Sequence, residues 1–178
     1  MRRISTTLIL VILFFTLSSH ELFLKSDSYF FNEYSESELF LFNGTFDQSE
    51  NIITRDRIIN PLIIGPDYNF KPEATDFYDK GKATYLKFKT GSSGTYVAGI
   101  STNPSAIELN GEDFSAYLEH EGLTEIITDR KNKGITQKSA NEKYAKHVKA
   151  ILQVDEKRTD HFSTELHYPI EFIPLKNP

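Results

Sequence analysis

The side chains of this chain that suit transition-metal chemistry are its histidines and carboxylates. The sequence holds five histidines and no cysteine, so a transition-metal site must be built from imidazole, carboxylate and amine groups. The five are His20, His120, His147, His161 and His167. No two of them lie four residues apart, so the two-histidine motif of a helical zinc site is absent.

His20 has the clearest chemical rationale as a metal ligand. It follows two arginines, an apolar run over residues 8–17 and two serines, which is the pattern of a secretory signal peptide. The apolar run is about half of what a membrane-spanning helix needs, so we expect export without a stable membrane anchor. If the signal peptidase cuts after Ser19, the mature chain begins at His20. Its α-amine and ring Nδ1 can then chelate one divalent ion, since these nitrogens suit Ni, Cu and Zn.

The position of the cut is open between alternatives. A cut after Ser19 gives a signal peptide over 1–19 and a mature domain over 20–178. A cut after Ser18 leaves Ser19 first. A cut after Leu17 would expose Ser18-Ser19-His20, an amino-terminal Cu/Ni chelating triplet, but Leu is large for the residue before the cut.

His147 is the second candidate ligand. Apolar residues alternate along 148–154, so we expect a strand there, with His147 at its start on the polar face. We therefore predict His147 as the first partner of His20. His120 lies beside two glutamates on an expected helix and is interpreted as solvated surface. His161 and His167 follow acidic residues in a loop and are interpreted as structural or incidental.

Composition excludes several classes of function. Without residues 1–19 the chain has 18 basic and 25 acidic side chains, a formal charge of −7, and no basic cluster, so we expect no nucleic-acid partner. The absence of cysteine excludes disulfides and a thiol nucleophile, and export without disulfides favours a bacterial periplasm or cell surface. Gly91-Ser92-Ser93-Gly94 lacks the Gly-x-Ser-x-Gly pattern of a nucleophile elbow, and phosphate-binding glycine loops are missing. We expect a protein that is not an enzyme.

Short apolar and aromatic runs separated by turn residues predict a mainly β fold. The expected strands are 22–25, 38–42, 57–64, 84–89, 95–100, 148–154 and 169–173. The Gly91-Ser92-Ser93-Gly94 turn predicts a hairpin between 84–89 and 95–100.

Residues 110–146 predict a helical insertion between strands. Asn110 is an expected N-cap for a short helix that ends near Gly122, and a second helical piece is expected over Leu123–Arg130. Thr136 is the expected cap of a third helix from Gln137 to about Lys146, because this segment is rich in Lys, Glu and Ala.

Six stretches, taken in order, carry a resemblance to a known family. They are His20–Lys25, Phe42–Phe46, Gly94–Gly99, Asp113–Gly122, Tyr144–Val154 and Pro169–Leu175. Their order and spacing resemble the NikM-like family of bacterial periplasmic proteins, a poorly characterised domain linked to nickel and cobalt uptake systems. The resemblance spans nearly the whole mature chain.

This resemblance implies an immunoglobulin-like or transthyretin-like β-sandwich that handles a divalent metal outside the inner membrane, with a metal-uptake transporter as its partner. The family histidine that follows the leader matches His20, whereas no family histidine is expected at His120 or His167. Family members usually continue past 174–178 into a second small β-sandwich, so we expect this chain to be a shortened member.

We therefore expect an exported, periplasmic or secreted accessory protein that binds or delivers nickel, cobalt or copper. The alternative is an interaction module that binds a protein or a carbohydrate through sheet edges and exposed aromatic side chains. Tyr29, Phe30, Phe31 and Tyr34 could stack on sugar rings, although we interpret them first as core or edge packing.

Overall fold

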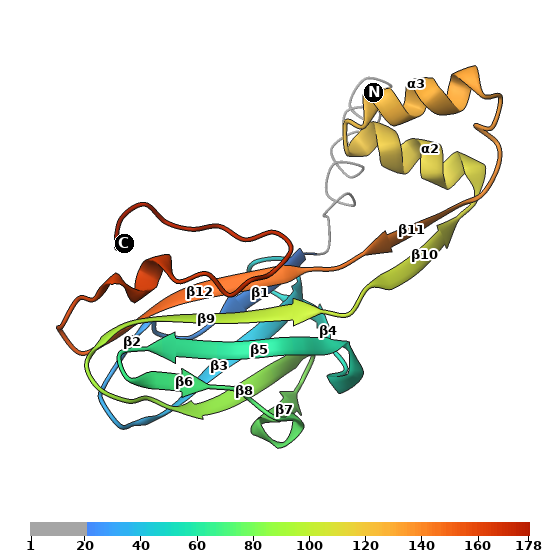
Figure 1. The fold of residues 1–178 in the computed structure, drawn as a ribbon. Helices are drawn as coiled ribbons and strands as arrows, with labels where there is room; N and C mark the ends of the chain where they lie inside the picture. Colours follow the sequence, from blue (N-terminus) through green and yellow to red (C-terminus); the bar gives the residue numbers. More distant parts are fainter. Residues whose placement is uncertain (1–20) are drawn as a thin grey trace, which may run out of the picture. The chain divides into compact units, whose positions relative to one another are not determined.

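The computed structural model describes residues 21–178, and this part of the chain is mainly β with a sandwich-like architecture (Figure 1). The signal peptide predicted over 1–19, and His20, lie outside the described residues. Pro104–Ala145 forms one compact unit, and the remaining described residues form another. Within residues 21–178, none of the helices has the length and apolar character needed to cross a membrane.

The larger unit contains two five-stranded sheets. The strands of the first are Glu21–Lys25 (β1), Glu36–Gly44 (β3), Ser49–Asn51 (β4), Phe77–Lys80 (β7) and Ala83–Lys89 (β8). They lie in the order β1-β3-β8-β7, with β4 paired to β3, and all pairings are antiparallel. The predicted strands at 22–25, 38–42 and 84–89 are confirmed.

The second sheet has the order β2-β12-β9-β5-β6. Its strands are Phe30–Phe31 (β2), Ile58–Gly65 (β5), Tyr68–Phe70 (β6), Gly94–Thr102 (β9) and His147–Val154 (β12). Only the β2–β12 pairing is parallel. The predicted strands at 57–64, 95–100 and 148–154 are confirmed, and each observed strand starts within one residue of its predicted start. Three short 3-10 helices lie at Arg55–Arg57 (η1), Ala74–Asp76 (η2) and Asp160–Ser163 (η3).

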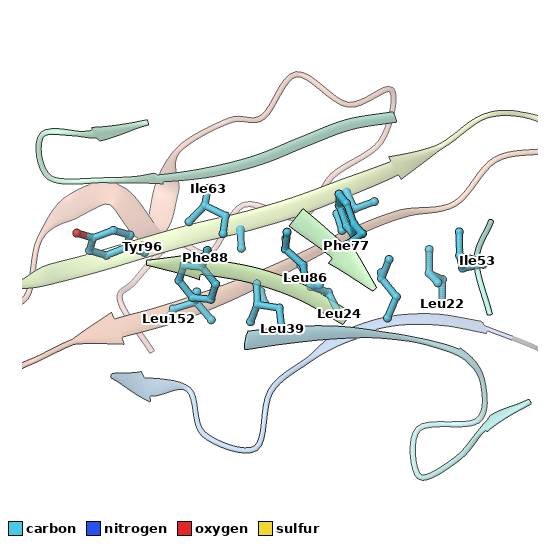
Figure 2. Close-up of a cluster of buried hydrophobic side chains, with 14 of the residues drawn as sticks. Leu22, Leu24, Leu39, Ile53, Ile63, Phe77, Leu86, Phe88, Tyr96 and Leu152 are labelled. Atoms are coloured by element: carbon cyan, nitrogen blue, oxygen red, sulfur yellow. The ribbon is translucent and has the colours of Figure 1, made fainter. Parts of the chain in front are cut away.

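The core of the larger unit lies between the two sheets, because alternate side chains of each strand point inward (Figure 2). The first sheet contributes Leu22, Leu24, Leu39, Leu41, Phe77, Leu86 and Phe88. The second contributes Ile63, Tyr96, Ala98, Ile100, Ala150, Leu152 and Val154. The two-residue period that predicted one wet face along 84–89 is confirmed, since Lys87 and Lys89 are exposed.

The outer face of the second sheet is covered by the C-terminal segment, defined here as residues 155–178. Leu166 and Tyr168 form a second buried cluster with Val97 of β9. All nine residues of β9 are therefore buried, with neighbours on both faces of the strand. Gly99 permits this approach, because a Cβ atom at this position would lie 2.2 Å from Cδ1 of Leu166.

The predicted hairpin between 84–89 and 95–100 is wrong. β8 lies between β3 and β7 in the first sheet, whereas β9 lies between β12 and β5 in the second. The Gly91–Gly94 link therefore crosses from one sheet to the other. Both strands have their hydrogen-bonding edges filled by other partners, so they do not pair with each other.

The unit Pro104–Ala145 combines a two-stranded antiparallel sheet with two helices. Its elements are Ser105–Leu109 (β10), Gly111–His120 (α2), Thr124–Asn132 (α3) and Ala140–Tyr144 (β11). The first two predicted helices are confirmed, and the Asn110 side chain accepts a 2.9 Å hydrogen bond from the backbone N–H of Asp113 as an N-cap. Arg130 is buried and donates to the carbonyls of Ile135 and Lys138, which fixes the chain after α3.

The third predicted helix, Gln137 to about Lys146, is wrong. Its residues 140–144 form β11, which pairs with β10 over Leu109↔Ala140 to Ser105↔Tyr144. Helix propensity in a Lys, Glu and Ala-rich segment is a weak preference that strand pairing overrides. The strand predicted at 169–173 is wrong as well, since this stretch has no regular secondary structure.

Candidate metal-binding site

His147 is the first residue of β12 and lies directly opposite Ser101 of β9 in the strand pairing. Its Nδ1 atom is 2.6 Å from Oγ of Ser101. Its ring stacks on Tyr168 of the C-terminal segment, with the ring centres 5.9 Å apart and the planes 28° apart. The imidazole is half-buried and is held on two sides.

The hydrogen bond with Ser101 engages Nδ1 of His147, and either atom can be the donor. In the tautomer whose Nδ1–H donates to the Ser101 hydroxyl, the lone pair of the neutral ring lies on Nε2. No hydrogen-bond partner of Nε2 is found among residues 21–178. Metal-binding histidines in proteins show this arrangement, in which an outer group holds one ring nitrogen and orients the other toward the ion.

Tyr168 supports the imidazole and is itself fixed in place. Its hydroxyl donates a 2.8 Å hydrogen bond to the carbonyl of Asn60, which lies at an irregularity in the β5–β9 pairing. Burial, and to a smaller degree the charge of Glu171, raise the pKa of the Tyr168 phenol. Tyr168 therefore stays neutral and packs against His147 instead of acting as an anionic ligand.

Glu171 is a carboxylate of the C-terminal segment whose oxygens are already occupied. They accept hydrogen bonds from Nζ of Lys149 at 2.7 Å and from the backbone N–H groups of Leu166 and His167. Burial alone would raise the pKa of Glu171, but the bond from Lys149 and these N–H groups outweigh it and hold the pKa below its ordinary value. Glu171 thus fastens the C-terminal segment to β12.

The starts of β1 and β12 lie at the same end of the sandwich. β1 continues through a short link into β2, and β2 runs parallel to β12. β1 and β12 are neighbours that run in the same direction (Figure 1). Glu21, the first described residue, therefore lies at the end of the molecule where His147 begins β12. His20 immediately precedes Glu21 in the sequence.

The other histidines are dispersed. His120 is exposed at the end of α2, with Nδ1 3.0 Å from Oε1 of Glu121. His161 lies in η3 and its Nδ1 is 3.0 Å from Oγ1 of Thr159. His167 is exposed and has a positive φ of 60°. Over residues 21–178, no group of three or more His, Cys, Asp or Glu side chains is arranged to hold a metal ion.

The groups that orient His147 were not found by sequence reasoning. Ser101 ends an apolar run that contains no polar motif, and Tyr168 is separated from His147 by more than twenty residues. The alternation along 147–154 correctly places His147 on the face of β12 opposite the sandwich core. The C-terminal segment covers this face, so it is only partly exposed to solvent.

The aromatic residues of the alternative interpretation differ in their burial. Phe31 packs edge-on against Phe88 of the core, with ring centres 5.7 Å apart, as the packing interpretation expects. Phe30 and Tyr34 are 69% and 62% exposed. These two side chains are thus available to a partner, and packing does not account for them.

No protein-family model, curated protein or solved structure matches this chain. The resemblance to the NikM-like family remains a prediction from the sequence, and the candidate site rests on the geometry around His147.

Proposed function

We propose that this protein is an exported accessory protein that binds a divalent transition metal, nickel, cobalt or copper, and passes it to a metal-uptake system. It acts without catalysing a reaction, in the periplasm or outside a bacterial cell. The sandwich would be of the immunoglobulin-like or transthyretin-like type that the NikM-like resemblance implies. In this proposal the metal is cargo, held by the amine and ring of an N-terminal His20 and by Nε2 of His147.

The orientation of His147 is the single observation that carries this proposal. Its Nδ1 is engaged by Ser101 and its ring is stacked on Tyr168, while Nε2 has no hydrogen-bond partner within residues 21–178. The order of the strands supports the pairing with His20, since β1 and β12 begin at one end of the sandwich.

The donor set fits the proposed ions. Two imidazoles and one amine give three nitrogen ligands, which suit Ni²⁺ and Cu²⁺ better than Mg²⁺ or Ca²⁺. A site with three protein nitrogens keeps positions open for water or for a ligand of the receiving protein. An open coordination sphere is what a delivery protein needs, because cargo must leave it.

The test is calorimetric titration of the exported protein with Ni²⁺ and Cu²⁺, after its N-terminus has been determined by intact mass. We expect His20→Ala and His147→Ala each to weaken binding by at least about tenfold. His120→Ala is the matched control, because His120 is exposed and lies in the other compact unit, and it should leave affinity unchanged. Unchanged affinity in both His20→Ala and His147→Ala would refute the proposal.

A further inference from the structure

A groove opens where the chain leaves the first sheet for the second. β1 pairs with β3 only from Lys25↔Phe40 to Glu21↔Gly44, and residues 26–29 then cross to β2. The first residues of β3, before Phe40, therefore have no β1 residue paired beside them. The space left there has a volume of about 590 Å³, within the range of small-molecule sites in proteins.

The lining of this groove combines many short polar groups with one aromatic ring. The hydroxyls come from Ser26, Ser28 and Ser37, the carboxylates from Asp27, Glu36 and Glu38, the ammonium from Lys87 and the ring from Phe31. The hydroxyls of Ser26 and Ser28 already donate to the carbonyls of Glu38 and Phe30, so they can accept from a ligand, as the carboxylates can, while the ammonium donates. A ligand that carries many hydroxyl groups matches this density of donors and acceptors.

A row of aromatic rings continues from the groove along the outer face of the first sheet. Tyr78 donates a 2.8 Å hydrogen bond to Oε1 of Glu38, which joins the row to the groove. Tyr78 stacks on Tyr85 with ring centres 5.1 Å apart, and Tyr85 lies 5.4 Å from Phe40. Nζ of Lys87 lies 4.8 Å from the centre of the Tyr78 ring. Tyr78 and Tyr85 are half-buried, so part of each side chain remains at the surface.

We propose that this groove and the adjoining aromatic row bind a pyranose oligosaccharide that carries no acid groups. The hydroxyls of one sugar unit bond to the polar lining, and the next units lie along Tyr78 and Tyr85. The faces of these rings are taken up by Phe40, by Lys87 and by each other, so the sugar would contact their exposed edges. A sugar ring has a hydroxylated edge and less polar faces, so it can use polar and aromatic contacts side by side.

The charges of the lining exclude acidic sugars. Asp27, Glu36 and Glu38 face a single ammonium, Lys87, so a carboxylated or sulfated saccharide would meet like charge. An uncharged saccharide meets no such repulsion, and its hydroxyl groups can donate hydrogen bonds to the carboxylates. This inference is independent of the metal proposal, because none of the groove residues takes part in the environment of His147.

The test is an NMR titration of the ¹⁵N-labelled protein with a panel of oligosaccharides, with a metal chelator present throughout. The panel contains uncharged hexasaccharides of α- and β-linked glucose and of N-acetylglucosamine, with hexagalacturonate as the acidic member. We expect at least one uncharged member to bind at millimolar concentration or below, with shifts confined to residues 26–38 and 78–87. Hexagalacturonate should bind at least about tenfold more weakly.

Variants separate binding from folding. Asp27→Ala and Lys87→Ala remove exposed groups of the groove, and each should reduce affinity by about fivefold or more while the unfolding midpoint stays unchanged. Phe172→Ala is the matched control, since Phe172 is an aromatic side chain 91% exposed on the C-terminal segment, and it should bind like wild type. The proposal is overturned if no uncharged member shifts the groove residues, or if Asp27→Ala and Lys87→Ala bind as tightly as wild type.

Discussion

Nζ of Lys149 lies 2.7 Å from Oε2 of Glu171, and both side chains are only 11% exposed. This ion pair joins β12 to a segment 22 residues later in the sequence. The same ammonium donates to the carbonyl of Thr164, and the same carboxylate accepts from the backbone N–H groups of Leu166 and His167. The pair thus holds the C-terminal segment on the sheet and keeps Tyr168 stacked on His147.

Replacement of Glu171 by Ala should lower the free energy of unfolding by about 1–3 kcal/mol, because it leaves the mostly buried Lys149 side chain without its charged partner. Denaturant titration followed by circular dichroism measures the change. Lys133→Ala is the control, since Lys133 forms an exposed pair with Asp129 and its loss should cost less than about 0.5 kcal/mol. Equal effects of the two substitutions would contradict the role given to Glu171.

The same carboxylate predicts how stability depends on pH. The pKa of Glu171 is lower in the folded protein than its ordinary value of 4.5. Between these two values the unfolded state binds more protons, so stability rises with pH. The contribution of Glu171 is complete above pH 4.5 and is lost as the pH falls through the folded value. Unfolding curves measured over this acidic range should show a shallower loss of stability for Glu171→Gln than for wild type, and parallel losses would argue against this assignment.

Gly99→Ala should destabilise the protein by about 1–3 kcal/mol, because the new methyl group would lie 2.2 Å from Cδ1 of Leu166 and 2.9 Å from the Tyr168 ring. Thermal unfolding measures the loss. A double-mutant cycle with Leu166→Ala gives the internal control, since removal of Cδ1 relieves the clash and the two losses should be less than additive. Simple additivity would show that the C-terminal segment does not contact β9 at this position in solution.

Ser101→Ala should weaken Ni²⁺ and Cu²⁺ binding by about 10- to 100-fold if His147 is a ligand, because the imidazole loses the partner that orients Nε2. Thr is the conservative replacement at this position, and Ser101→Thr keeps the hydroxyl and should restore most of the affinity. Calorimetric titration measures both. If the alanine variant is folded by circular dichroism and binds the metal like wild type, Ser101 does not contribute to the site.

Several strands of the sandwich were predictable, because strands such as β8 and β12 carry a two-residue alternation that matches the core. In β8 the buried Leu86 and Phe88 alternate with the exposed Lys87 and Lys89, and the sequence alone shows this pattern of apolar and charged residues. Pairing partners were not predictable in the same way. The glycine-bounded turn after Lys89 suggested a hairpin, yet the turn carries the chain between sheets, since alternation says which residues are buried and not which strands are adjacent.

Segments with weak patterns were predicted poorly for identifiable reasons. Residues 140–144 favour a helix by composition, but the edge of β10 offers them a strand partner. Residues 169–173 have apolar alternation, but Pro169 has no N–H to donate to a strand neighbour, and Glu171 turns inward to Lys149. In both cases a contact distant in sequence outweighs the local preference.

The sequence by itself determined the mainly β character of the chain, the inward and outward faces of β8 and β12, and the two helices after Asn110. Each of these follows from local periodicity and capping. Only the tertiary structure decided that His147 is oriented by Ser101 and Tyr168, that the C-terminal segment covers β9, and that a polar groove opens beside Tyr78. These features join residues tens of positions apart, and their positions depend on strand order and packing, which local sequence patterns do not encode.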